Sequence, residues 1–181
     1  MSPGILAYTQ TLQLRLWSFV RVPLLYRVKP SVVELSEERA VISVPLIRRN
    51  RNHLDSMYFG VLACGADIAG GLLAAKAIRD SGEVFSLVFR DFKADFLRRP
   101  ESDTHFVCNE GGRISELLEK ALASGEREEM TAHIEAYCPD SENSDPVARF
   151  KLTLCLKKRT TGKNPQGLGG LIQKCFPSFA G

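Results

Sequence analysis

The sequence lacks the residue patterns that typically hold structural metals or disulfide networks. Its three histidines show no metal-ligand spacing, and its five cysteines include no Cys-x-x-Cys pair. An odd number of cysteines placed in apolar runs is typical of reduced, buried thiols in the cytosol. We therefore expect no metal, no cofactor and a cytoplasmic protein. The residues concerned are His53, His105, His133, Cys64, Cys108, Cys138, Cys155 and Cys175.

A strong charge bias, an internal repeat and a signal peptide are missing as well. The 24 basic and 21 acidic residues give a net charge of +3, which does not call for a nucleic-acid partner. Residues 1–4 lack the basic segment that begins a signal peptide. The 181 residues, 44% of them hydrophobic, indicate one globular domain with a sizeable core.

The most informative segment is Met57–Ala75, in which Asp67 is the only charged residue. The segment approaches transmembrane length, but a central charge and several glycines argue against a membrane span. We predict instead a buried central helix over Met57–Arg79. Because an unpaired buried carboxylate is costly, Asp67 is either satisfied by neighbouring groups or takes part in chemistry.

The N-terminal segment predicts an amphipathic helix over Ile5–Arg27, broken or kinked near Pro23. We expect its apolar face to pack against the domain or a partner subunit. Contact with a membrane surface is the alternative, because arginines and Trp17 also suit an interface. The apolar face consists of Leu6, Leu12, Leu16, Phe19 and Val20.

The rest of the chain predicts antiparallel strands joined by polar turns. A change of phase in the apolar alternation at Arg90–Asp91 predicts a bulge. A short helix is expected over Ile114–Ala123. The expected strands are Ser31–Leu35, Ala40–Leu46, Val84–Phe96, Thr104–Cys108, Met130–Cys138 and Val147–Lys157.

Together these elements predict an α+β fold in which a curved antiparallel sheet wraps around the long central helix. The chain divides into an N-terminal helix packed on the domain (residues 1–30), the main domain (31–158) and an irregular tail (159–181). The tail is rich in glycine and proline.

Within residues 31–158 the sequence resembles the hotdog-fold acyl-CoA thioesterases, in particular the phenylacetyl-CoA thioesterase type. Asn52, Gly60, an acidic residue at Asp67 and the strand ending Phe96-Leu-Arg-Arg-Pro100 carry the resemblance. Tyr58 and Phe59 stand where the family has His-Gly. The resemblance implies a hotdog fold and a less characterised branch of that superfamily.

By this resemblance the chain hydrolyses an acyl-CoA or acyl-carrier thioester, and Asp67 is the general base or nucleophile. The amide of Gly60, in the first helical turn, would stabilise the oxyanion. Asn52 would hold the loop or orient water, with an ordinary turn residue as the alternative.

The spacing of Gly60 and Asp67 indicates how a site could be assembled. Seven residues place them on one helix face, about 10 Å apart along the axis. That separation is too large for both groups to act on one carbonyl from a single chain. A homodimer, or a pair of dimers, could place Gly60 of one chain near Asp67 of the other.

Further residues are candidates for substrate binding, each with a structural alternative. Tyr58 and Phe59 could face the acyl group or pack in a core or interface. Ser56 could contact substrate or cap the helix. Arg48, Arg49 and Arg51 could bind the phosphates of coenzyme A or lie in a solvated loop.

Two other functions remain open at this point. A non-catalytic protein that binds acyl thioesters or lipids would explain the missing His-Gly. A dehydratase or hydratase is less favoured, because such hotdog enzymes pair a carboxylate with a histidine, and none accompanies Asp67 on its helix.

Overall fold

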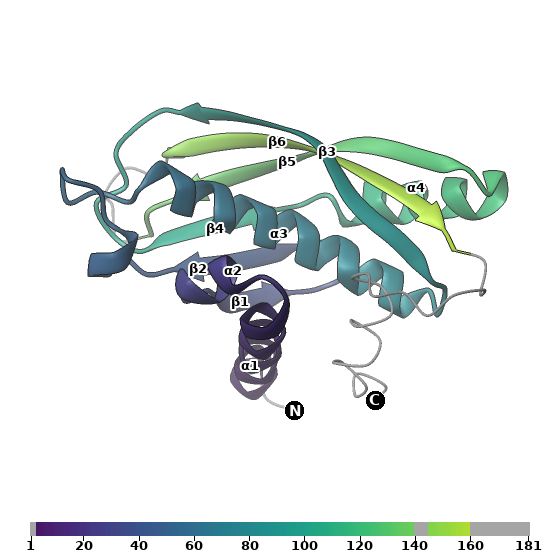
Figure 1. Ribbon diagram of the computed structural model, residues 1–181, viewed down its shortest axis with the longest axis horizontal. Coiled ribbons are helices and arrows are strands. Elements are labelled where there is room, and N and C mark those ends of the chain that lie inside the picture. Colours follow the sequence, from purple (N-terminus) through teal and green to yellow (C-terminus); the bar gives the residue numbers. More distant parts are fainter. Residues whose placement is uncertain (1–2, 140–144, 160–181) are drawn as a thin grey trace.

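One six-stranded antiparallel sheet wraps around a long helix, α3, which runs along its concave side (Figure 1). The computed structural model describes residues 3–139 and 145–159. The strand order is β1-β2-β4-β5-β6-β3. The strands are β1 (Ser31–Leu35), β2 (Ala40–Val44), β3 (Phe85–Phe96), β4 (Thr104–Cys108), β5 (Arg127–Tyr137) and β6 (Ala148–Lys158). The predicted α+β architecture is therefore observed.

The helices agree with the predictions within a few residues. The predicted helix Ile5–Arg27 is broken near Pro23 as expected, because Val22, which precedes the Pro23 that opens the second helix, is not helical. The helices are α1 (Pro3–Arg21), α2 (Pro23–Arg27), α3 (Phe59–Asp80) and α4 (Gly111–Ser124), with a 3₁₀ turn η1 at Arg48–Asn50. The predicted tail lies outside the described residues from 160 onward.

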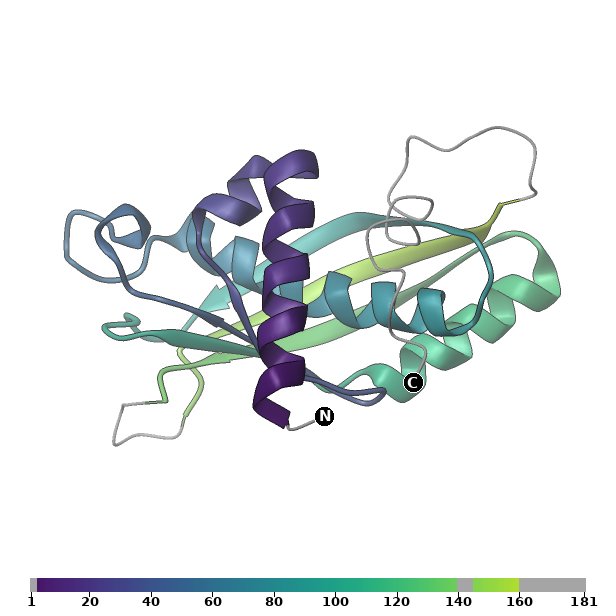
Figure 2. The same cartoon turned by 90° about the horizontal axis from the view of Figure 1, so that it is seen from below.

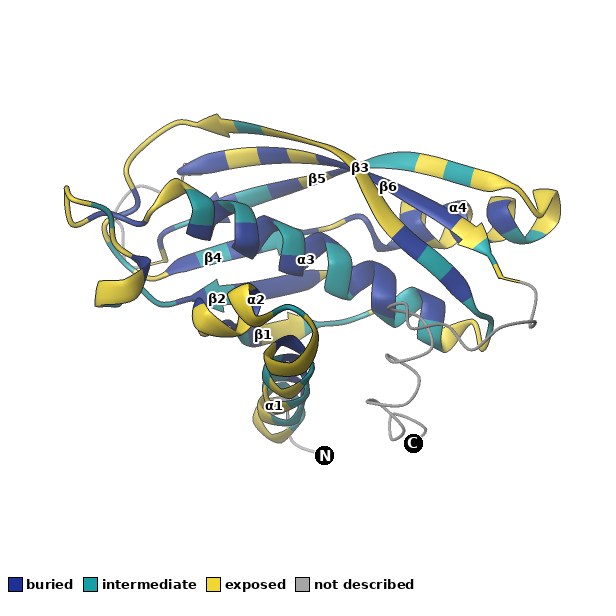
Figure 3. Cartoon of the chain, viewed as in Figure 1, coloured by how far each residue is buried: buried dark blue, intermediate teal, exposed yellow. Residues whose placement is uncertain are grey.

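The core lies between α3 and the inner face of the sheet (Figure 3). Alternate residues of β5, such as Ala132, Ile134 and Ala136, are fully buried there, because successive side chains of a strand point to opposite faces of the sheet. Gly65 of α3 packs so closely on the sheet that an added Cβ would lie 2.3 Å from the ring of Phe106. The small residues of α3 therefore set how closely the helix approaches the sheet.

The long strand β3 contains the predicted bulge. Its pairing with β6 changes register between Phe89 and Phe92, which brackets Arg90–Asp91. Asp91 accepts a hydrogen bond of 2.9 Å from the hydroxyl of Thr153 on β6. The bulge therefore gives Asp91 a partner on the neighbouring strand.

The two edges of the sheet differ. At the β1 edge, α1 supplies hydrogen-bonding partners: Val32 N–H donates to the hydroxyl of Thr11 at 2.8 Å, and Arg15 donates to the carbonyl of Pro30 at 2.8 Å (Figure 2). At the opposite edge, β3 pairs only with β6 among the described residues. One edge is covered, and a 12-residue edge is open.

The contacts of α1 with the strand edge correct one prediction. The face of α1 that packs on the domain includes Gln10, Leu14 and Ser18, all buried. The predicted packing face, with Leu12, Leu16, Phe19 and Val20, points away from the domain and is exposed. The expectation that this face packs on the domain was wrong, because bonding to a strand edge requires polar side chains.

Helix α3 is long and apolar enough to cross a membrane by length and composition. However, 67% of its most apolar window is buried inside the fold. Such burial is typical of the core helix of a folded domain, and the sequence predicted a buried central helix here. Among the described cysteines, Cys64, Cys108, Cys138 and Cys155 are free and buried as expected, whereas Cys175 lies outside the described residues.

We expect Gly65→Ala to lower the free energy of unfolding by about 1–3 kcal/mol, because its methyl group would overlap a fully buried ring. Gly70→Ala is the matched control on the same helix, since its Cβ would meet the nearest atom at 3.5 Å. The control should be neutral or slightly stabilising. Urea unfolding of both variants measures the difference, and equal stabilities would contradict the packing described.

Candidate functional site

A cavity of about 390 Å³ lies against the middle of α3, between β3 and the two N-terminal helices. Its volume falls within the range of small-molecule sites. Among the residues that the structure describes, Asp67 is the only charged one in its wall. The lining is Leu14, Trp17, Val22, Leu25, Asp67, Ile68, Gly71, Leu72, Ala75, Leu87, Val88 and Phe89.

Asp67 has no hydrogen-bond or ion-pair partner among the described residues. Burial of the carboxyl group raises its pKa from the ordinary 3.8 to about 6. Burial of the Cys64 thiol, together with the charge of Asp67 three residues away, raises the pKa of that thiol. Of the two alternatives for Asp67, satisfaction by neighbouring groups is not observed.

Two residues that line the cavity together with Asp67 were not identified from the sequence as site residues. The indole N–H of Trp17 is buried without a hydrogen-bond acceptor. Gly71, one turn after Asp67, leaves the carboxylate uncovered on its cavity side, since an added Cβ would lie 3.9 Å from Oδ1. The sequence placed Trp17 on the N-terminal helix. It did not indicate that the Trp17 side chain faces the domain, because that depends on how α1 packs against β1.

The start of α3 forms a second group of candidates, outside the cavity lining. The amide of Val61 donates to the carbonyl of Tyr58 at 2.9 Å, whereas those of Phe59 and Gly60 have no acceptor among the described residues. The Tyr58 ring lies over Gly60, where an added Cβ would be 2.6 Å from Cε1. Gly60 thus provides a free amide, and its missing side chain makes room for Tyr58.

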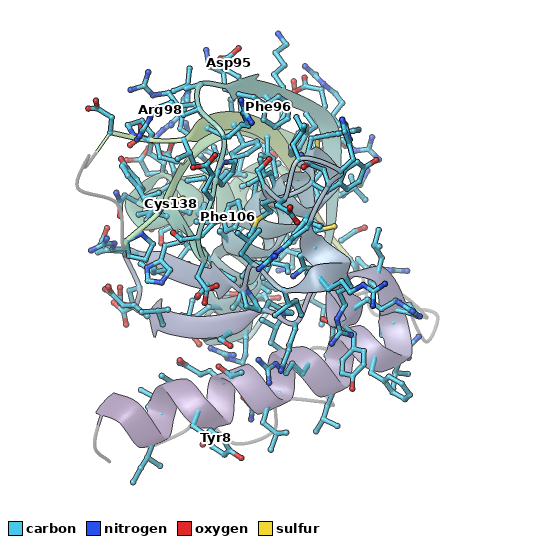
Figure 4. All side chains as sticks on the ribbon, turned by 90° about the vertical axis from the view of Figure 1, so that its left-hand side faces the viewer. Tyr8, Asp95, Phe96, Arg98, Phe106 and Cys138 are labelled. Atoms are coloured by element: carbon cyan, nitrogen blue, oxygen red, sulfur yellow. The ribbon has the colours of Figure 1, made fainter. Side chains whose placement is uncertain are left out.

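Aromatic rings surround this helix start. The ring of Phe59 lies 4.6 Å from that of Tyr58 and 6.3 Å from that of Phe96 on β3, measured between centroids. All three side chains are exposed. Phe96 also contacts Phe150, which contacts the buried Phe106, and Figure 4 labels Phe96 and Phe106. Tyr58 and Phe59 therefore join a partly exposed aromatic surface at the β3 edge.

The loop before α3 is held by Asn52. Its Oδ1 accepts hydrogen bonds from the amides of Leu54 and Ser56, and its Nδ2 donates to the Ser56 hydroxyl at 3.0 Å. Ser56 is buried in this network and does not cap α3, whose N-cap is Tyr58 without a side-chain cap. The capping role expected for Ser56 was wrong, because Asn52 engages its hydroxyl.

The three arginines of the basic loop differ in their surroundings. Arg48 and Arg49 are exposed and form no ion pair among the described residues. Arg51 donates to the carbonyl of Leu46 and pairs with Asp55. Asn50, which the sequence did not single out, is buried and ties the loop to α2 by donating to the carbonyl of Val28 at 2.9 Å.

A polar cluster on the outer side of the sheet was also missed. The carboxylate of Glu110 accepts hydrogen bonds from the amide and Nδ1 of His133, each at 2.9 Å, and from Arg113. Although burial opposes it, these bonds lower the pKa of Glu110. Because β4 has ended at Cys108, Glu110 supplies the acceptor that β5 lacks at His133. The cluster has a structural role.

No group of three or more metal-ligating side chains is close enough to hold an ion within residues 3–139 and 145–159. The charged groups described above, Asp67, the loop arginines and the Glu110 cluster, lie on different elements. The chemistry that the cavity offers is accordingly that of one carboxylate in an apolar wall that also includes Trp17.

Solved structures share this architecture. A protein of unknown function from Pseudomonas aeruginosa, named a probable thioesterase, superposes with a TM-score of 0.67 at 22% identity, covering 82% of this chain and 95% of its own. A thioesterase family protein from Silicibacter pomeroyi gives 0.59 at 17% identity, covering 82% and 99%. A protein of unknown function from Chlorobaculum tepidum gives 0.70 at 11% identity, covering 84% and 97%.

These similarities show that the chain has the hotdog fold, as the resemblance in sequence implied. The chain belongs to the family described as Domain of unknown function (DUF4442), which matches residues 11–156. The match includes most of α1 as well as the sheet and α3. A search of curated proteins found no match.

The raised pKa of Asp67 predicts a pH-dependent stability. Folding is not penalised below about pH 3, where the carboxyl is protonated in both the folded and the unfolded chain, and the penalty grows to about 3 kcal/mol above about pH 7. We expect the stability of Asp67→Asn relative to wild type to rise by up to that amount between these pH values. Urea unfolding across the range measures it, and a pH-independent difference would show a satisfied carboxylate.

Proposed function

We propose that this protein hydrolyses an acyl thioester bound in the Asp67 cavity. One observation supports the proposal above others: a single unpaired carboxylate lies in an otherwise uncharged, mostly apolar cavity, with its pKa raised to about 6. A base with a pKa near the working pH is both ionised and able to hold a proton. The apolar wall suits the acyl chain.

In the proposed reaction Asp67 removes a proton from a water molecule while the oxygen of that water attacks the thioester carbonyl carbon. The carbonyl oxygen becomes an oxyanion, which free backbone amides stabilise. Collapse breaks the carbon–sulfur bond, and the proton held by Asp67 passes to the departing sulfur. The products are a carboxylic acid and a thiol. Direct attack by Asp67 through an anhydride is the variant with a nucleophilic carboxylate.

The oxyanion donors would come from a second copy of the chain. Gly60 and Asp67 are about 10 Å apart along α3, and Gly60 is outside the lining of the cavity. The open β3 edge, with exposed Phe92 and Phe96, offers the pairing surface. In the proposed homodimer the two β3 edges meet, and the helix start of one copy approaches the Asp67 cavity of the other.

The exposed Arg48 and Arg49 are the candidates for binding the phosphates of coenzyme A in this arrangement. Arg51 is a weaker candidate, because its guanidinium already contacts Leu46 and Asp55. A dehydratase is less well supported than a hydrolase, because no histidine lines the cavity in the described part of the chain.

A non-catalytic acyl-binding protein is the second candidate. The observation in its favour is the pair Tyr58-Phe59 at the position of His-Gly, with the Tyr58 ring folded over the amide region of Gly60. A ring in that place restricts access to the proposed oxyanion donor. This candidate predicts binding without turnover.

The catalytic proposal is tested with a panel of acyl-CoA substrates and a thiol-release assay. Asp67→Asn should reduce kcat by at least about 100-fold while binding of a non-hydrolysable thioether analogue is retained. Wild-type kcat should rise with pH around a midpoint near 6. Asp80→Asn is the control, since Asp80 is on the same helix but pairs with Lys76. Analogue binding with no turnover of any substrate supports the second candidate.

The dimer is tested with Phe92→Asp, which places a charge on the open strand edge. Sedimentation velocity should show a dimeric wild type and a monomeric variant, and thiol release should fall with the dimer. Val33→Asp is the matched control, because Val33 is an exposed apolar residue on the edge strand that α1 covers. A monomeric wild type, or equal dissociation by both variants, would rule out assembly through β3.

A further inference from the structure

Helix α1 has its apolar side turned outward. The side that meets the domain includes three buried polar atoms without a hydrogen-bond partner, in Gln13, Trp17 and Ser18. The opposite side is apolar, and its residues are 42–71% exposed (Figure 3). We call this side, with the adjoining tyrosine of α2, the outer apolar face: Ile5, Tyr8, Leu12, Leu16, Phe19, Val20 and Tyr26.

The outer apolar face is continuous and points away from the rest of the molecule. Figure 4 shows Tyr8 directed away from the domain. The rings of Phe19 and Tyr26 contact edge to face, 5.1 Å between centroids, so the face extends from α1 onto α2. A contiguous exposed surface of this kind on a folded chain indicates a partner.

The charges within the segment that includes the outer apolar face are all of one sign. Residues 1–33 contain four basic residues and no acidic residue. Arg21, Arg27 and Lys29 are exposed and form no ion pair within the described part of the chain. The bond from Asn50 to Val28 brings the η1 turn, with Arg48 and Arg49, to the end of α2. A basic border therefore adjoins the apolar surface.

We propose that the outer apolar face docks on the surface of an anionic lipid bilayer. Helices that lie in the membrane interface bury an apolar face among the acyl chains and place basic residues at the headgroups. Unpaired basic side chains gain attraction from anionic lipids, and tyrosine suits the depth of the headgroups. The inference does not depend on the proposed hydrolysis.

The charges favour a bilayer over a second copy of the chain as the occupant of this face. A two-fold contact between two outer apolar faces would bring the basic residues of both copies together, with no acidic residue in either segment to neutralise them. An anionic bilayer supplies the missing negative charge.

The test is flotation of the full-length protein with phosphatidylglycerol–phosphatidylcholine vesicles. Wild type should bind these vesicles and should bind phosphatidylcholine vesicles and high-salt samples more weakly. Leu16→Gln/Phe19→Gln should weaken binding at least about tenfold, because the substitutions remove two apolar side chains that would be buried among the lipid acyl chains. Arg21→Gln/Arg27→Gln should weaken binding to the anionic vesicles only. Leu54→Gln is the control, an exposed leucine outside α1.

Wild type that stays with the unbound fraction overturns the proposal, whatever the variants do. An equal loss for Leu54→Gln also overturns it, because the outer apolar face would then not be responsible. Sedimentation velocity identifies the other occupant: if Leu16→Gln/Phe19→Gln dissociates an oligomer, the face is covered by a second copy. Circular dichroism checks that each variant is folded, and the arginine variant tests the same surface without altering its apolar residues.

Discussion

Everything in this fold depends on covering α3, a helix without a polar face. From Phe59 to Ala75 it contains one charged side chain, so it must be shielded from water on nearly every side. The curved sheet covers one side with fully buried residues such as Phe106 and Phe150. The remaining side is covered by α1, α2 and β3, and these leave a cavity. The cavity thus exists where the covering of the helix is incomplete.

The location of Asp67 follows from the same constraint. A carboxylate among apolar residues costs more free energy than an asparagine or an alanine would, and the structure offers it no partner among the described residues. A fold can tolerate one such group when the rest of its core is closely packed, as Gly65 against Phe106 is. Functional residues are often held in this way at the expense of stability.

The sequence predicted those features that depend on local pattern. The period of the apolar residues located every strand of the described chain, the phase change at Arg90–Asp91 located the bulge, and the long apolar run located the central helix. It did not predict which face of α1 meets the domain. That choice depends on Thr11 and Arg15 bonding to the backbone of a strand edge, and such an edge has no sequence signature. For the same reason Trp17 was not predicted to lie in the cavity wall. The hydrogen bond between Asn52 and the Ser56 hydroxyl was not predicted either.

The unequal edges of the sheet limit how far it can grow. At the β1 edge, hydroxyl and guanidinium groups of α1 already bond to the strand backbone, so another strand cannot add there without displacing the helix. The β3 edge can accept one further strand. Two chains that join at β3 therefore form a sheet that is terminated by α1 at both ends. Such a sheet cannot propagate into a fibre, so the chain can keep a long, aromatic edge strand without the usual risk of open-ended aggregation.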